Sequence, residues 1–167
     1  MEVEATKALL EVQVPEWWTA AQQAESFGFD EGRMFVGGWS AGGHLTAAVC
    51  DHPAFRGGLP ISGIFDLEPI ALNYLNEKLS LDAAEVADMS PLRTLAKPRG
   101  PLHVSVGGAE LPELQRQSRD YAAAAQARGF QVELSVLAGH HHFSIMEELC
   151  RPDGALVGHL RELIAGA

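Results

Sequence analysis

The sequence predicts an α/β fold in which a parallel sheet of about four strands carries helices on both faces. Short apolar segments, several of them bounded by glycine, alternate with longer segments whose apolar residues recur at helical spacing. Such alternation is typical of parallel sheets whose strands are connected by helices. The 167 residues, 47% of them hydrophobic, suffice for a sizeable core, so we expect residues 1–167 to form a single domain.

The first half of the chain begins with an expected helix and continues with strands and helices in alternation. Apolar residues at helical spacing follow Pro15, a favourable first-turn residue, and Gly28 is placed to end this helix. The segments expected next are a strand over 33–38, a helix over 41–51 and a strand over 57–65. Within the last of these, Pro60 lacks an N–H and weakens the strand pattern.

The second half continues the alternation after a mixed segment. Residues 66–98 show no single period, and we expect short helices there. Strands are expected over 101–108 and 131–137, with a helix between them that ends at Gly129. The last helix is amphipathic, and Asp153 is placed to be its N-cap.

The charge balance narrows the range of partners. The chain has 12 Lys and Arg against 22 Asp and Glu, a net charge of -10, and no basic cluster, so we expect no nucleic-acid partner. No apolar run approaches the roughly 20 residues that cross a bilayer, and the first residues do not resemble a signal peptide. We therefore expect no membrane partner and a cytoplasmic protein. Cys50 and Cys150 share no metal or redox spacing and are expected to be reduced thiols.

A serine between glycines follows the first expected strand. Gly38-Trp39-Ser40-Ala41-Gly42 fits G-x-S-x-G, the nucleophile elbow, in which a sharp strand-to-helix turn lifts the serine hydroxyl above a sheet. We expect glycine to be required at both Gly38 and Gly42, because a side chain at either would collide in the tight turn. The N–H of Ala41 is placed to donate to an oxyanion. Trp39 either lines a substrate pocket or packs in the core.

A nucleophilic serine needs an acid and a histidine, which in this type of fold follow it in that order on loops after later strands. Glu110 follows the third expected strand and is the favoured acid. Glu113 and Asp66 are the alternatives, and an ordinary salt bridge is a further interpretation of Glu110. Asp66 also follows a strand and would serve in a triad built differently.

Three histidines, His140 to His142, follow the fourth expected strand. His142 directly precedes Phe143, an apolar residue that can anchor the loop, and is the favoured base, with His141 as the next choice. Consecutive side chains diverge, so we expect no metal site at the triplet, and no cofactor. His44 lies too close in sequence to Ser40 to act as its base and is expected to pack beside the site or support it.

These motifs resemble the α/β-hydrolase superfamily and, more narrowly, its esterase and kynurenine formamidase (arylformamidase) branch. The segments that carry the resemblance span most of the chain: GGWSAGGHL, ISGIFDLEPI, YLNEKLSL, MSPL, GGAELPELQRQS and HHHF. The resemblance implies Ser40 as nucleophile, Glu110 as acid and His142 as base. Aspartate normally stands where this chain has Glu110, but a longer carboxylate can still orient an imidazole.

The segment before the elbow differs from the family pattern. The family normally has several strands there, and a loop with an H-G-G type motif whose N–H groups complete the oxyanion hole. The chain therefore resembles a truncated α/β-hydrolase fold, the carboxy-terminal half of the family without its N-terminal strands. The elbow strand would then be a sheet edge, so we expect either a homo-oligomer formed through this edge or a helix from residues 1–27 that shields it.

Two functions are consistent with these expectations. The first is a serine hydrolase that acts on a small-molecule substrate, either small carboxylic esters or aryl formamides such as N-formylkynurenine, with activity reduced by the absent oxyanion-hole segment. The second is a catalytically impaired hydrolase fragment or scaffold that serves as a binding module.

Overall fold

The centre of the protein is a four-stranded parallel sheet, seen in a computed structural model that describes residues 26, 28 and 30–166. Each strand pairs with the next along the chain. The strands are β1 (Met34–Trp39), β2 (Phe55–Ile61), β3 (Leu102–Gly107) and β4 (Val132–Leu137). The α/β class with a parallel sheet of about four strands, predicted from the alternating pattern, is confirmed.

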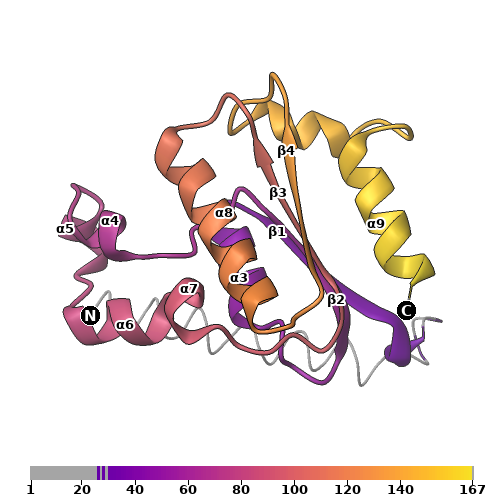
Figure 1. Cartoon of the computed structure of the whole chain (residues 1–167), viewed down its shortest axis with the longest axis horizontal. Helices are drawn as coiled ribbons and strands as arrows, with labels where there is room; N and C mark the ends of the chain where they lie inside the picture. The colour runs from indigo at the N-terminus through magenta and orange to yellow at the C-terminus, as the bar shows by residue number, and fades with distance from the viewer. Residues whose placement is uncertain (1–25, 27, 29, 167) are drawn as a thin grey trace.

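Helices cover both faces of this sheet (Figure 1). On one face lie α3 (Ala41–Ala48) and α8 (Pro112–Ala127), and on the other lies α9 (Ala155–Ala165). Residues 66–98 form short helices, as expected from their mixed pattern. The remaining helical elements are η1 (Glu31–Arg33), α4 (Glu68–Ala71), α5 (Asn76–Leu79), α6 (Ala83–Met89), α7 (Pro91–Thr94) and η2 (Ser144–Leu149).

Two apolar clusters hold the layers together, one on each face of the sheet. Beneath α3 and α8, the ring of Phe65 stacks on that of Tyr121 with 4.4 Å between the centroids. On the other face, Leu156 and Leu163 of α9 pack with buried residues of β2 and η2. Burial of each large apolar side chain contributes about 1.5–3 kcal/mol, so these clusters fix the helices on the sheet.

Two element ends differ from the expectations. The second strand ends at Ile61 and does not continue to residue 65, because Ser62 adopts a left-handed φ of 49°. The N-cap of α9 is Gly154 and not Asp153, so that prediction was wrong. The side chain of Glu148 accepts a hydrogen bond from the Ala155 N–H at 2.6 Å and thereby caps the helix. Asp153 instead lies 3.5 Å from the guanidinium of Arg151.

The helix expected after Pro15 lies outside the described residues. Gly28 is described and has a φ of 72°, a left-handed conformation that is common where helices end. Within the described part of the chain β1 pairs with β2 alone and thus forms an edge of the sheet. No helix among the described residues is long and apolar enough to cross a membrane. Both cysteines are free thiols, Cys50 buried and Cys150 exposed.

Candidate active site

The candidate nucleophile lies in a strained turn between β1 and α3. Ser40 has φ 58° and ψ −115°, which L-residues rarely adopt; such strain costs of order 1–3 kcal/mol and is concentrated at functional sites. The backbone N–H of Ser40 donates to the Ile61 carbonyl at the end of β2 (2.9 Å), which fixes the turn against the sheet. The serine therefore stands at the carboxyl ends of the strands, where open parallel sheets bind their ligands.

The glycines around this turn differ in whether a side chain would fit at their position. A Cβ on Gly38 would lie 2.4 Å from the carbonyl group of Gly42, so no side chain fits at Gly38. A Cβ on Gly42 would meet nothing within 4 Å, so the expectation that a side chain would collide there was wrong. The sequence analysis missed Gly43, whose Cβ would lie 2.7 Å from the Cα of Gly63. Close contact between α3 and the end of β2 explains this requirement.

Three side chains from three loops form one chain of hydrogen bonds. Ser40 Oγ lies 3.0 Å from His142 Nε2, and His142 Nδ1 lies 2.8 Å from Glu110 Oε2. Both distances are within the usual range for hydrogen bonds to imidazole nitrogen. Ser40 follows β1, Glu110 follows β3 and His142 follows β4, so the parallel strands deliver all three groups to one edge of the sheet.

The carboxylate of Glu110 is held by more than the histidine. Its side chain is inaccessible to solvent, and its Oε1 accepts hydrogen bonds from the Ser62 hydroxyl (2.5 Å) and the Gly107 N–H (2.8 Å). With His142 Nδ1–H donating to Oε2, both oxygens of the buried carboxylate accept hydrogen bonds that fix its position. Sequence reasoning missed Ser62, because the strand expected over 57–65 includes this residue whereas the observed strand ends at Ile61.

The two alternative acids are engaged elsewhere. Asp66 accepts a hydrogen bond from Arg93 Nε at 3.1 Å. Glu113 pairs with Arg116 at 2.6 Å, and this guanidinium holds the pKa of Glu113 below its usual value. Neither carboxylate is within hydrogen-bond distance of the histidine at Ser40, whereas Glu110 is.

The other two histidines of the triplet stabilise the loop. The Nδ1 of His140 bonds to the Ser144 carbonyl (3.1 Å), and its Nε2 lies 3.3 Å from a Glu148 oxygen. The Nδ1 of His141 accepts from the backbone N–H groups of Phe143 and Ser144, at 3.2 and 3.3 Å. Of the three histidines of the triplet, it is therefore His142 whose ring faces Ser40.

Trp39 supports the histidine loop. Its indole N–H donates to the backbone carbonyl of His142 at 2.7 Å, and the two rings lie 4.8 Å apart between centroids. The ring also packs against the apolar cluster beneath α9. Trp39 thus packs against this cluster and helps to fix the His142 loop over the elbow, while its role in lining a substrate pocket stays a prediction.

Two further groups adjoin the serine on α3. Within the described residues the N–H of Ala41, first in this helix, has no protein acceptor and is free to donate. His44 points away from the serine and donates from Nδ1 to the Ile64 carbonyl at 2.8 Å. Burial lowers the pKa of His44, so the ring is neutral at neutral pH. His44 accordingly packs beside the site, as expected.

Comparison with known proteins places this fold in a family. A profile of the alpha/beta hydrolase fold matches residues 7–94, and the chain belongs to this family. Among curated proteins it is 31% identical over 144 residues to kynurenine formamidase of Danio rerio and 32% identical over 146 residues to that of Salmo salar. The resemblance seen in the motifs, to the α/β hydrolases and their kynurenine formamidase-like branch, is thereby confirmed.

Solved structures agree with this assignment. A Silicibacter protein of inferred thioesterase activity superposes with a TM-score of 0.70 at 30% identity, over 81% of this chain and 53% of that one. Esterase 2 of Thermogutta terrifontis superposes with a TM-score of 0.64 at 21% identity, over 88% of this chain and 58% of its own. The latter identity supports the fold alone.

The alignments with the two kynurenine formamidases cover most of this chain but only about half of each relative. The Danio rerio and Salmo salar alignments each cover 78% of this chain, and 49% and 48% of the respective relatives. The chain thus spans about half the length of the curated relatives that it matches.

Proposed function

We propose that the protein is a serine hydrolase in which Ser40 is the nucleophile, His142 the general base and Glu110 the acid that orients it. The observation that carries the proposal is the continuous path from Ser40 Oγ through both ring nitrogens of His142 to the buried carboxylate. A serine, a base and an orienting group within hydrogen-bond reach are what nucleophilic acyl transfer requires. We propose further that residues 1–167 form a single domain.

In the proposed acyl transfer, Glu110, His142 and Ser40 each have a distinct role. Glu110 accepts a hydrogen bond from Nδ1–H of His142, so Nε2 carries the lone pair that removes the Ser40 proton as Oγ attacks a carbonyl carbon. The resulting imidazolium gives its proton to the leaving alcohol or amine, and an acyl-serine remains. Water then attacks the acyl group with His142 again as base, which releases the acid and restores the serine.

The oxyanion of each tetrahedral intermediate needs hydrogen-bond donors. The N–H of Ala41, at the N-terminus of α3, is the donor closest to Ser40 in sequence, and the helix end also favours negative charge. Removal of one donor from such a site costs about 10²–10³ in turnover. We therefore expect low turnover where Ala41 donates alone, and higher turnover where backbone from another chain supplies a second donor.

The substrates proposed are small carboxylic esters or aryl formamides of the N-formylkynurenine kind. Two of the curated relatives are kynurenine formamidases, and the Silicibacter relative at 30% identity has an inferred thioesterase activity. One exposed apolar side chain lies beside the site, since Phe143 is 70% exposed and its ring centroid is 5.5 Å from that of His142. Apolar side chains beside a reactive serine favour an acyl or aryl group over a charged one.

A fluorophosphonate probe tests the nucleophile directly. We expect stoichiometric labelling of the folded protein that is lost in Ser40→Ala and retained in Ser80→Ala, a control that removes an exposed hydroxyl outside the site. Hydrolysis of p-nitrophenyl acetate and N-formylkynurenine by the wild type and by His142→Ala then separates the two substrate classes. Absence of labelling in folded protein would reject the enzyme.

A scaffold with little chemistry is the second candidate. The observation that favours it is that the chain spans about half of its curated relatives. In this case the edge strand β1 would serve as the binding surface and pair with a second copy of the chain. Sedimentation analysis of the purified chain, with and without fluorophosphonate labelling, distinguishes an inert oligomer from an active enzyme.

A further inference from the structure

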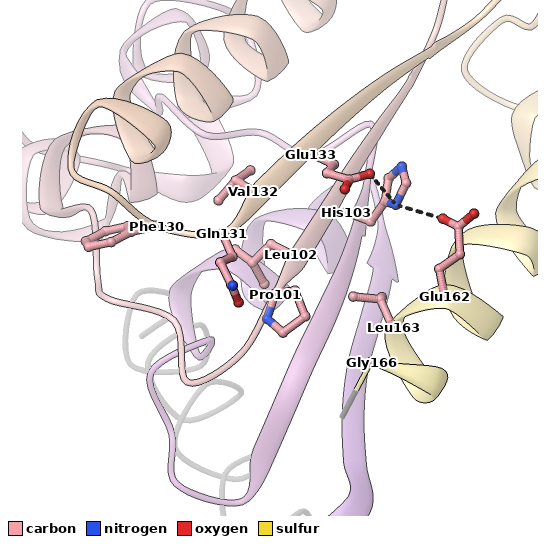
Figure 2. Close-up of a pocket in the computed structure, with 10 residues that line it drawn as sticks. All are labelled: Pro101, Leu102, His103, Phe130, Gln131, Val132, Glu133, Glu162, Leu163 and Gly166. Carbon is pink, nitrogen blue, oxygen red and sulfur yellow. Dashed lines mark ion pairs between the residues drawn. The ribbon is translucent and has the colours of Figure 1, made fainter.

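A second cluster of polar side chains lies on the α9 face, away from the carboxyl ends of the strands. It brings together His103 of β3, Glu133 of β4 and Glu162 of α9, with one ligand atom of each within 4.8 Å of the others. His103 and Glu133 are the second residues of their strands, whereas the proposed catalytic groups follow the strand ends. Figure 2 shows both carboxylates directed at the His103 ring. The proposed hydrolase does not use this cluster.

The imidazole of His103 is buried, and one of its nitrogens lacks a hydrogen bond. The side chain is 7% exposed. Its Nε2 lies 3.0 Å from Ser135 Oγ, while Nδ1 has, within the described residues, only carboxylate oxygens of Glu133 and Glu162 nearby, each at 3.8 Å. That distance is too long for a hydrogen bond. Nδ1 of this largely buried ring therefore faces the two carboxylates without a hydrogen bond to either, at the side where the ring opens to the pocket.

A chain of hydrogen bonds behind His103 can fix its tautomer. His159 stacks on His103 with 3.5 Å between ring centroids, and it contacts Ser105 through Nδ1 (3.2 Å) and Ser135 through Nε2 (3.3 Å). When Nδ1–H of His159 donates to Ser105, its Nε2 accepts from Ser135, and Ser135 in turn accepts from Nε2–H of His103. When the hydrogen bonds run in this order, Nδ1 of His103 carries no proton and presents a lone pair to the two carboxylates.

In this tautomer one imidazole nitrogen and two carboxylates converge, which is a ligand set for a divalent cation. A ligating histidine normally donates its other N–H to a fixed partner, and Ser135 occupies that position.

The dimensions suit an ion after a small movement of the two glutamates. In a tetrahedral site with bonds of about 2.1 Å, ligand atoms lie about 3.4 Å apart. The present 3.8 Å contacts to Nδ1 need only a slight contraction. The carboxylates are 79% and 70% exposed and can rotate to make it, while His103 stays fixed in the sheet. They open on a pocket of about 480 Å³, which leaves room for water as a further ligand.

We propose that His103, Glu133 and Glu162 form a binding site for a divalent transition-metal ion of the Zn²⁺ type, completed by water. An imidazole nitrogen suits such ions, whereas Ca²⁺ and Mg²⁺ prefer oxygen ligands alone. The bound ion joins β3, β4 and α9, so it stabilises the packing of the last helix on the sheet. The site is independent of the proposed hydrolase, because its ligands lie away from the carboxyl ends of the strands.

Isothermal titration of metal-free protein with Zn²⁺ tests the site. We expect one ion per chain and a rise in the midpoint of thermal unfolding. Glu133→Gln and Glu162→Gln remove exposed charges and leave the core intact, and each should weaken binding tenfold or more. Ser135→Ala, which removes the partner of Nε2, should weaken it about 10–100-fold. The control Glu77→Gln removes an exposed charge elsewhere and should leave binding unchanged.

Three results would overturn the proposal. The first is the absence of Zn²⁺ binding to folded protein. The second is Zn²⁺ binding that the two glutamine variants leave unchanged, which would place the ion elsewhere, for example at the His140 to His142 triplet. The third is Ca²⁺ binding as tight as that of Zn²⁺ with the same dependence on the two glutamates, which would reject a site selected by imidazole.

Discussion

The buried hydrogen bond from Ser62 to Glu110 allows a quantitative test of how the proposed acid is held. The change Ser62→Ala removes the hydroxyl and keeps Cβ, so the left-handed backbone, with φ 49°, has the same steric cost in both proteins. Oε1 of Glu110 then loses one of its two donors and keeps the Gly107 N–H. Since Ser62 is fully buried, solvent does not replace the lost donor in an unchanged structure.

The expected loss follows from the charge of the acceptor. A hydrogen bond to a charged group contributes about 1.5–3 kcal/mol to stability, against about 0.5–1.5 kcal/mol for a neutral pair. At about 2–4 °C per kcal/mol for a domain of this size, the midpoint of thermal unfolding should fall by about 3–12 °C. Ser118→Ala is the matched control: Ser118 is equally buried, but its hydroxyl donates to the neutral Leu114 carbonyl at 2.9 Å.

Thermal and urea denaturation followed by circular dichroism measure the stability, and p-nitrophenyl acetate hydrolysis measures the effect on the site. We expect Ser62→Ala to lower kcat several-fold with KM unchanged, because Glu110 orients the base and does not contact substrate in the proposed mechanism. Ser118→Ala should leave kcat unchanged. If both variants melt alike and both keep full kcat, the argument that Ser62 holds the acid is refuted.

Three further predictions concern the elbow, the acid and a buried histidine. Gly38→Ala should prevent the native turn, since its Cβ would meet the Gly42 carbonyl, while Gly42→Ala is tolerated; equal melting of the two variants would contradict this geometry. Glu110→Gln favours the wrong tautomer of the proposed catalytic imidazole of His142, so kcat should fall on the order of 10⁴-fold; a fall of less than about tenfold in the ester assay would exclude Glu110 as the acid. The lowered pKa of His44 means that the unfolded chain takes up its proton first, so stability is lost as the pH falls below about 6.5. His44→Gln should reduce that loss in urea denaturation at acidic pH, and an unchanged pH dependence would show that His44 does not contribute.

The sheet could be predicted from the sequence because its signals are local. Each strand is a short apolar run, and the helix between the last two strands has its own period and is followed by Gly129, which has a φ of 76°. Errors arose where a tertiary contact overrides the local pattern. Asp153 has the residue type of an N-cap, but Glu148 reaches the helix end from η2, and no local pattern encodes that contact.

The motif residues of the candidate site could be predicted from the sequence, but the residues that hold them in position could not. G-x-S-x-G and the order of acid and histidine are visible along the chain, whereas the donor from Ser62 depends on how β2 lies beside β3. The need for glycine at Gly43 likewise depends on the distance between α3 and Gly63. The cluster around His103 combines single residues from two strands and a helix, so it has no sequence signature.

The order of the strands has a consequence for biosynthesis. Because each strand pairs with its predecessor, the sheet can assemble one unit at a time as the polypeptide leaves the ribosome. Ser40 and His142 are 102 positions apart, so at about 5–20 residues per second the serine is made about 5–20 s before its base. In the proposed mechanism a nascent chain therefore holds an unactivated hydroxyl until the loop with His142 is translated, and termination before that loop would leave the serine without its proposed base.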